Sequence, residues 1–181
     1  DVTIIEKDVQ GEPASFGNAS WLSAPSITPV LTPGAIFKIP KPLKVDASKL
    51  ILALDKINNP GNLGTIIRLC DWFGVKDLIC SNNTVDCYNS KVVQSAMGSH
   101  TRVNISYVEL ECFLEKSSNV IGTFTESKNS IYETELPSSG VIVLGNEANG
   151  ISSKIASKIN MGLTIPRFGI HKKTESLNVA N

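Results

Sequence analysis

The chain has 181 residues, of which 41% are hydrophobic and 19% are charged, so it can bury the core of one domain. This composition excludes a disordered chain, a collagen and a small disulfide-stapled fold. The 17 basic residues balance the 17 acidic ones, and a formal net charge of zero gives no overall positive field of the kind that marks nucleic-acid-binding proteins. A local basic patch can still serve such a partner.

The sequence carries no signal for a membrane or for secretion. No apolar run approaches the roughly 20 residues of a membrane-spanning helix, and the first ten residues lack the basic start and apolar stretch of a signal peptide. No CxxC motif is present, so we expect reduced thiols and a cytoplasmic location. With two histidines in the chain, we expect no metal. The four cysteines are Cys70, Cys80, Cys87 and Cys112.

Two regions of the chain differ in composition. Residues 1–45 are rich in proline and in glycine, serine and alanine, with short strand-like runs at 2–5 and 35–39. We interpret them as a linker and the remnant of an upstream domain. From residue 46 to residue 181 the pattern alternates between strands and helices, as in one α/β domain.

The predicted elements follow one another in a regular order. The apolar run LILAL at 50–54 predicts a strand buried on both faces, and the helix after it ends at Gly74. Strands separated by helices indicate a mostly parallel sheet with helices on both faces. The strands are expected at 50–54, 78–80, 103–108, 120–124, 141–144 and 163–165, and the helices at 62–73, 90–97, 109–116 and 152–159.

The first unusual strand end is the segment DKINNPGNLGTIIR after the first strand. Asn62 is expected to cap the helix through its side-chain oxygen, and Arg68 lies farther along that helix. A capped helix with one solvated arginine is the simpler interpretation. The density of asparagine and glycine favours a loop whose backbone approaches a ligand.

The second is VIVLGNEANGI, where a strand runs directly into Gly145 and Glu147 and Gly150 closes a turn. The glycines free backbone groups to contact a ligand. Glu147 is expected to pair with Arg68 or to bind a hydroxyl or amino group. An ordinary strand-to-helix turn explains the same residues equally well.

The third is LTIPRFGIHKKTESLNVAN. Pro166 and Gly169 interrupt the strand end, a basic loop follows, and Ser176 is expected to begin a helix. Such basic loops are usually solvated surface, but a phosphate backbone would need these charges locally. The ends of parallel strands are where open α/β sheets bind ligands.

Several common nucleotide and hydrolase motifs are missing. The chain has neither GxGxxG nor GxxxxGK[ST], so dinucleotide binding and P-loop hydrolysis are not supported. It also lacks GxSxG, which argues against a serine hydrolase.

Taken together, NNPGNLGTIIR, VLGNEANGI and IPRFG followed by ESLNVAN resemble the three signature motifs of the SpoU/TrmH family. These are RNA ribose 2′-O-methyltransferases of the SPOUT class. The resemblance covers about residues 45–181, and the segment SKVVQSAMGSH resembles the family's helix between the first and second motifs.

The resemblance implies a SPOUT fold with a C-terminal trefoil knot, S-adenosylmethionine as cofactor, a homodimer, and rRNA or tRNA as substrate. It also implies roles for named residues. The functional polar positions are Asn62, Arg68, Glu147, Ser176 and Asn178, and the cofactor contacts, mostly through backbone, are Gly145, Ile165, Leu177 and Asn178.

Two other functions remain open at this point. One is a non-catalytic RNA-binding or dimerisation module of the same fold, and the other is an RNA base methyltransferase. The family continues beyond the position of Asn181 through a C-terminal helix, so we expect this chain to be truncated there.

Overall fold

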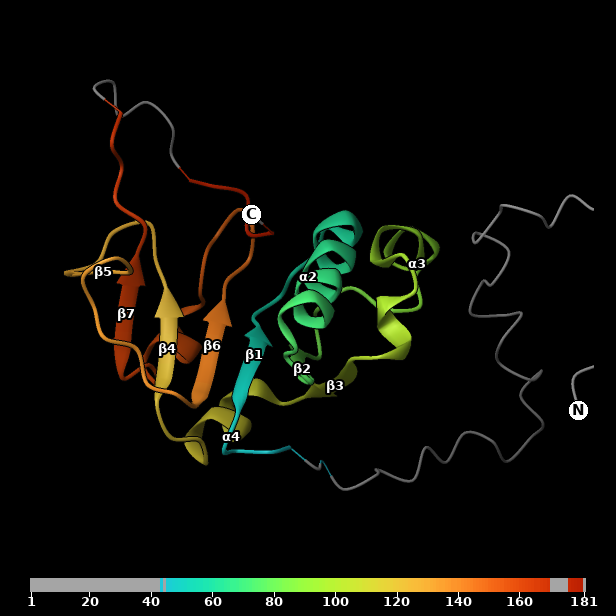
Figure 1. Cartoon of the computed structure of the whole chain (residues 1–181), viewed down its shortest axis with the longest axis horizontal. Helices are drawn as coiled ribbons and strands as arrows, with labels where there is room; N and C mark the ends of the chain where they lie inside the picture. The colour runs from blue at the N-terminus through green and yellow to red at the C-terminus, as the bar shows by residue number, and fades with distance from the viewer. Residues whose placement is uncertain (1–42, 44, 170–175, 181) are drawn as a thin grey trace, which may run out of the picture.

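A computed structural model describes residues 43, 45–169 and 176–180 (Figure 1). Strands and helices alternate as predicted, with small shifts at their ends. The helices are α2 (Pro60–Phe73), α3 (Ser90–Ala96), α4 (Leu110–Glu115) and α5 (Ser153–Ala156), with a 3-10 turn at Ser99–Thr101. The strands are β1 (Leu50–Leu54), β2 (Asp77–Ser81), β3 (Asn104–Val108), β4 (Val120–Thr123), β5 (Asn129–Ser130), β6 (Gly140–Leu144) and β7 (Met161–Thr164).

The seven strands form one sheet in the order β3-β2-β1-β6-β4-β7-β5, and every neighbouring pair is parallel. The predicted parallel sheet is therefore confirmed. Strand β5, with two residues, is missing from the prediction because so short a strand has no readable periodicity. Since all strands point the same way, their carboxyl ends meet along one edge of the sheet.

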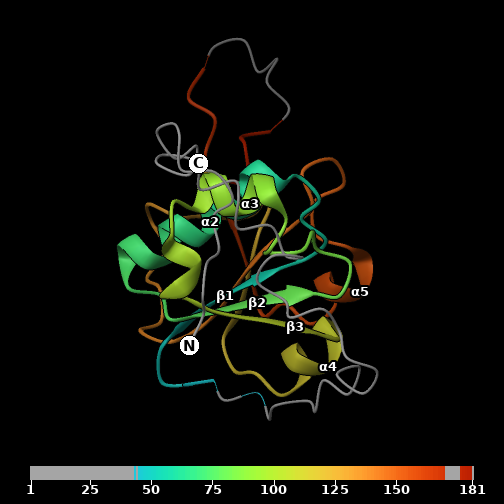
Figure 2. The ribbon, with the colours of Figure 1, turned by 90° about the vertical axis from the view of Figure 1, so that its right-hand side faces the viewer.

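Helices cover both faces of the sheet, as predicted. Figure 2 shows α2 and α3 on one side of the strands and α4 on the other. Alternate side chains of β1 enter the two cores, since Leu54 packs with α2 and α3 whereas Ile51 and Ala53 pack with α4 and α5. The apolar run of β1 is thus explained by burial on both faces.

Helix α2 begins one residue after Asn59, which is its N-cap. The Asn59 side chain accepts hydrogen bonds from the backbone N–H of Gly61 (2.8 Å) and of Asn62 (3.3 Å), and Pro60 occupies the first helical position. The prediction that Asn62 caps this helix is wrong. Proline at the first helical position sets the start of the helix, so the residue before it is the cap. At the other end, Gly74 ends the helix at φ 73°, as predicted.

Two predicted helices differ from the structure. Helix α5 is shorter than expected. The Ser152 side chain makes no cap bond, and the Ser152 backbone N–H donates to the Asp55 carboxylate at 2.7 Å. The expected helix from Ser176 is wrong for the described residues 176–180, which form coil and a turn. There the Asn178 side chain accepts from Ala180 N–H at 2.8 Å, a local bond that competes with helix formation.

Some predictions concern residues outside the described ranges. Most of the 1–45 segment and the loop 170–175 lie outside them, so the upstream remnant and the knot stay predictions. In the described residues, no helix is both long and apolar enough to cross a lipid bilayer.

We predict that Gly64→Ala destabilises the protein, although alanine is the better helix former. A Cβ at Gly64 would lie 2.7 Å from the Val92 carbonyl oxygen, because α2 and α3 pack closely there. We expect a loss of about 2 kcal/mol in the free energy of unfolding, measured by urea denaturation. The exposed helix substitution Gln94→Ala is the control and should change stability little. An unchanged or raised stability of Gly64→Ala would contradict the packing described.

Candidate functional site at the carboxyl edge of the sheet

The candidate site lies where β1 and β6 run side by side. After β1 the chain leaves for α2 on one face of the sheet, and after β6 it leaves for α5 on the opposite face. Open α/β sheets bind ligands at such a divergence, outside the carboxyl ends of the strands. The first two sequence motifs follow these two strands directly, so the fold brings them together.

The Glu147 carboxylate joins the two loops. It accepts hydrogen bonds from the backbone N–H of Asn59 (3.1 Å), from the backbone N–H of Asn58 (3.3 Å) and from the Asn62 side-chain amide (3.1 Å). These donors surround the N-terminus of α2, where unpaired N–H groups and the helix dipole favour a negative charge. We call Glu147 with Asn58, Asn59 and Asn62 the carboxylate clamp.

The clamp also sets the ionisation of Glu147. Burial alone would raise the pKa of this carboxyl, but the hydrogen bonds from its own backbone, from Asn62 and from the N–H groups of Asn58 and Asn59 outweigh burial and hold the pKa below its ordinary value. The carboxylate is therefore charged at neutral pH.

A second contact ties the same loops. The Asn146 side-chain amide donates to the Lys56 carbonyl at 2.7 Å, and the Lys56 backbone N–H donates to the Ser81 hydroxyl at 2.9 Å. Lys56 has φ 59°, a left-handed conformation that costs energy for a residue with a side chain. Both of its backbone groups are thus held by neighbours, which keeps the loop after β1 in one shape.

Gly145 and Gly150 let the loop after β6 close on itself. The backbones of Asn146 and Gly150 exchange two hydrogen bonds of 2.9 Å, and Gly150 has φ 65°. A Cβ at Gly145 would overlap the Gly150 carbonyl carbon and the Ile151 backbone nitrogen. Only glycine fits there, so the turn that carries Glu147 depends on it.

The structure brings some predicted site residues together and leaves others apart. Asn62 and Glu147 are in direct contact. Arg68 is exposed on α2, and within the described ranges it makes no hydrogen bond or ion pair, so the expected pairing of Glu147 with Arg68 is wrong. The Glu147 carboxylate instead accepts hydrogen bonds from the amides nearest to it. Ile165 follows β7, and Ser176, Leu177 and Asn178 are exposed on 176–180.

Sequence reasoning missed three residues that build the site. Asn59 was recognisable, because asparagine directly before proline is a helix-start signal. Asn146 and Asp55 gave no such signal, since their partners Lys56 and Ser152 are distant in sequence. Asp55 is 2% exposed and fixes the start of α5 beside the end of β1.

The cysteines do not add a nucleophile to this site. None of the four forms a disulfide, and Cys70, Cys80 and Cys87 are buried. Burial raises the pKa of the Cys70 thiol to about 12, so this thiol stays protonated at neutral pH. The side chains described at the ends of β1 and β6 are the amides of the clamp and of Asn146 and the carboxylates of Glu147 and Asp55.

The three motifs and this fold agree with a known family. The sequence model of the SpoU rRNA Methylase family matches residues 49–181. The chain belongs to this family. The match begins at the first strand and includes all three motif loops.

Similar proteins include rRNA methyltransferases. The 23S rRNA (guanosine(2553)-2′-O)-methyltransferase RlmP of Bacillus subtilis is 30% identical, over 76% of this chain and 56% of its own length. The 23S rRNA (guanosine-2′-O-)-methyltransferase RlmB of Neisseria meningitidis is 32% identical, over 72% of this chain and 53% of its own length. The chain thus spans about half the length of these relatives.

A solved structure shares the fold. The SpoU methyltransferase AviRb from Streptomyces viridochromogenes, in complex with the cofactor AdoMet, superimposes with a TM-score of 0.67 and 26% identity. The likeness covers 76% of this chain and 54% of AviRb.

We predict that Glu147→Gln lowers the free energy of unfolding by about 1 kcal/mol at about pH 7, because a neutral amide accepts these bonds less well and must turn a donor toward them. Since the folded pKa is depressed, the stabilisation is fully present above the ordinary pKa of 4.5 and is lost as the pH falls through the lower folded value. The stability difference between the wild type and Glu147→Gln should therefore shrink on acidification, as measured by urea denaturation at several pH values.

The matched control is Glu133→Gln, at an exposed glutamate outside the clamp. It should leave stability nearly unchanged at every pH. A Glu147→Gln difference that stays constant from neutral to acid pH would show that the charge does not hold the clamp.

Proposed function

We propose that this chain transfers a methyl group from S-adenosylmethionine to the ribose 2′-hydroxyl of an rRNA or tRNA nucleotide. The observation that carries the proposal is the carboxylate clamp, which fixes the first and second motif loops together and holds the start of α2, the helix that carries the exposed Arg68. Membership in the SpoU rRNA Methylase family and the 2′-O-methyltransferase relatives support it.

The residues at this edge fit the cofactor. Ile165 and Leu177 are 44% and 62% exposed, so apolar side chains are open to an adenosine-like group there. Gly145 and Asn178 would add backbone and amide contacts. When bound, S-adenosylmethionine supplies an electrophilic methyl group on a sulfonium, which needs no metal.

Arg68 would act on the RNA. A guanidinium stays protonated, so we assign it to binding a phosphate and orienting the 2′-hydroxyl, whose proton can pass to that phosphate oxygen. Ser176 and Asn178 would hold the hydroxyl and the cofactor in line. Glu147 and Asn62 are positioning residues in this scheme, because they hold the loop that aims α2.

We expect Arg68→Ala to lower methyl transfer at least about 100-fold with little change in stability, because Arg68 is exposed and its loss removes a charged contact to the transition state. The measurement is transfer of a labelled methyl group to unmodified rRNA and tRNA, followed by nucleoside mass spectrometry. Arg68→Lys keeps the charge without the planar fork and should recover only part of the rate.

The product decides among the alternatives. A 2′-O-methylated nucleoside, resistant to alkaline cleavage, supports the proposal, whereas a methylated base would identify a base methyltransferase. S-adenosylhomocysteine titration covers the remaining case, since a wild-type chain that neither binds it nor transfers methyl groups would be a non-catalytic module. Wild-type turnover by Arg68→Ala would refute the role of Arg68.

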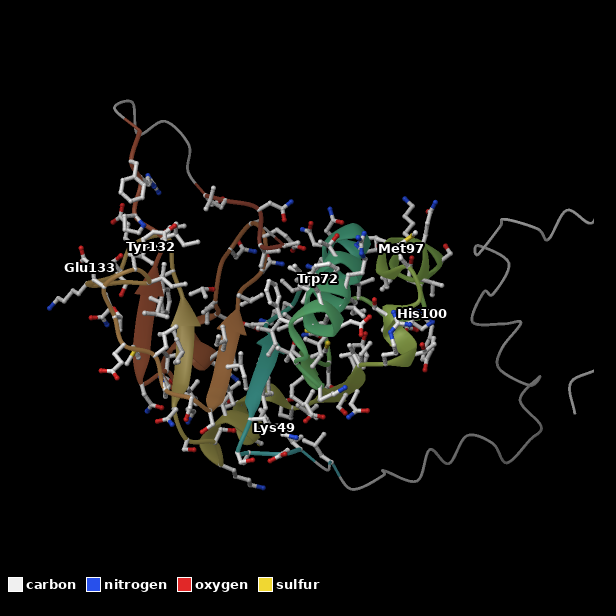
Figure 3. The ribbon with its side chains drawn as sticks, viewed as in Figure 1. Lys49, Trp72, Met97, His100, Tyr132 and Glu133 are labelled. Atoms are coloured by element: carbon white, nitrogen blue, oxygen red, sulfur yellow. The ribbon has the colours of Figure 1, made fainter. Side chains whose placement is uncertain are left out.

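We also propose a homodimer. Trp72, Phe73 and Met97 are 84%, 73% and 71% exposed at the ends of the adjacent helices α2 and α3, and Figure 3 shows Trp72 and Met97 on these elements. Apolar surface of this kind favours burial against a second copy.

We expect Trp72→Glu to raise the dimer dissociation constant at least about tenfold in sedimentation experiments, because it places a charge where apolar area is buried. Tyr88→Glu, at a half-exposed aromatic in another loop, is the control. A monomeric wild-type chain would contradict the proposal.

The domain assignment and location complete the proposal. We assign residues 46–181 to the methyltransferase domain, which the family match from residue 49 supports, and residues 1–45 to a linker and the remnant of an upstream RNA-binding domain. The four cysteines form no disulfide, which supports a cytoplasmic location.

A further inference from the structure

Two large aromatic side chains stand exposed at the same edge of the sheet, beside the proposed cofactor site. Tyr132 is 69% exposed and Phe168 is 82% exposed, although their rings are in contact, with centroids 6.3 Å apart and planes tilted by 49°. We call this pair the aromatic ledge. An aromatic pair of this geometry is attractive in itself, and its outer ring faces remain open.

The two halves of the ledge come from segments that the sheet holds together. Strand β5 pairs with β7, with Ser130 opposite Thr164, and Ile131 N–H donates to the Thr164 carbonyl at 3.0 Å. Figure 3 shows Tyr132 at the carboxyl end of these two strands. Phe168 is the fourth residue after the end of β7.

Hydrogen bonds within the turn fix the backbone around Tyr132 in the absence of a ligand. Thr134 donates to the Ser130 carbonyl through both its N–H (3.0 Å) and its hydroxyl (2.7 Å), and Tyr132 N–H donates to the Ser130 hydroxyl at 3.3 Å. A ring presented on a closed turn loses little conformational entropy on binding, which favours a role in recognition.

The ledge also lies near the proposed site of methyl transfer. Phe168 is three residues beyond Ile165, and three residues span at most about 10 Å. Ile165 is the predicted cofactor contact after β7. A group stacked on the ledge would therefore sit beside the nucleotide that receives the methyl group.

Local charge points to stacking as the source of affinity. In the sequence the neighbouring segments 126–135 and 167–175 carry equal numbers of basic and acidic residues, so their charges balance, as in the whole chain. The basic residues are Lys128, Arg167, Lys172 and Lys173, and the acidic ones are Glu126, Glu133, Glu135 and Glu175. Attraction to phosphates is weak in such surroundings. Proteins that recognise RNA without a strong positive field can use aromatic rings, on which unpaired bases stack.

We propose that the aromatic ledge of Tyr132 and Phe168 binds an unpaired base of the RNA substrate, next to the nucleotide that is methylated. The inference rests on the proposed RNA substrate. It joins Phe168 of the third motif loop with Tyr132, which lies outside all three motifs, in one base-binding site. The nucleobase is the ligand, and stacking is the dominant contact there.

Binding can be measured separately from catalysis. The probe is a single-stranded RNA oligonucleotide with 2-aminopurine at successive positions, whose fluorescence is quenched when the base stacks on a ring. We expect the wild-type chain to quench it, and Tyr132→Ala and Phe168→Ala each to weaken binding about tenfold. The dependence of affinity on salt should stay the same, because no phosphate contact is removed.

Kinetics then test the place of the ledge in the reaction. Each alanine variant should raise KM for RNA about tenfold and leave kcat and S-adenosylhomocysteine affinity within about twofold. Tyr132→Phe keeps the ring and should behave as the wild type. The control Tyr88→Ala removes an exposed aromatic from a different loop and should change neither quenching nor KM.

Three results would overturn the inference. Quenching and KM unaffected by Tyr132→Ala and Phe168→Ala would show that no base stacks there. Weaker S-adenosylhomocysteine binding by these variants would assign the ledge to the cofactor site, and loss of dimerisation would assign it to an interface between copies. If the wild-type chain transfers no methyl group but quenching is still lost in the variants, the ledge stands while the proposed function fails.

Discussion

The Glu147 carboxylate accepts several amide hydrogen bonds, and the geometry of the whole site depends on them. Glu147 comes from the loop after β6, and its donors surround the first turn of α2, which starts after β1. Neighbouring parallel strands bring these two loops within reach, and the helix dipole makes the position favourable for a negative charge. Without that carboxylate, the N–H groups of Asn58 and Asn59 would lose their partner.

The clamp also explains why Arg68 is available for another partner. The Glu147 carboxylate accepts its hydrogen bonds from amides, and Asp71 on α2 pairs with Arg102, so neither carboxylate pairs with the Arg68 guanidinium. A guanidinium that is to bind a phosphate has to remain exposed. The clamp fixes the loop at the start of α2 and so holds the helix that carries Arg68. In the proposed mechanism, Glu147 therefore acts by positioning α2 rather than by contact with the reacting atoms.

A chain with no net charge needs a source of affinity for the proposed RNA substrate other than its overall field. The chain offers two: an exposed arginine on α2, and the ring pair of Tyr132 and Phe168 beyond β5 and β7. The arginine lies on the helix that follows β1, whereas the ring pair follows β5 and β7. The sheet order, which places β6, β4 and β7 in succession, sets this spacing.

The sequence by itself determined the elements and the family. Three kinds of local pattern can be recognised without knowledge of the fold. They are the apolar run of β1, the glycine that ends α2 and the three motifs at strand ends. The N-cap of α2 is also recognisable in the sequence, because Asn59 directly precedes Pro60, although the prediction placed the cap at Asn62.

Only the tertiary structure decided which groups meet. The partners of Glu147 lie almost ninety residues away, and Asn146 reaches Lys56 over the same separation. The ring contact between Tyr132 and Phe168 depends on the pairing of a two-residue strand that no sequence pattern reveals. Hydrogen bonds and ring contacts require distances of a few ångströms, and those distances between remote residues are fixed by sheet register rather than by sequence spacing.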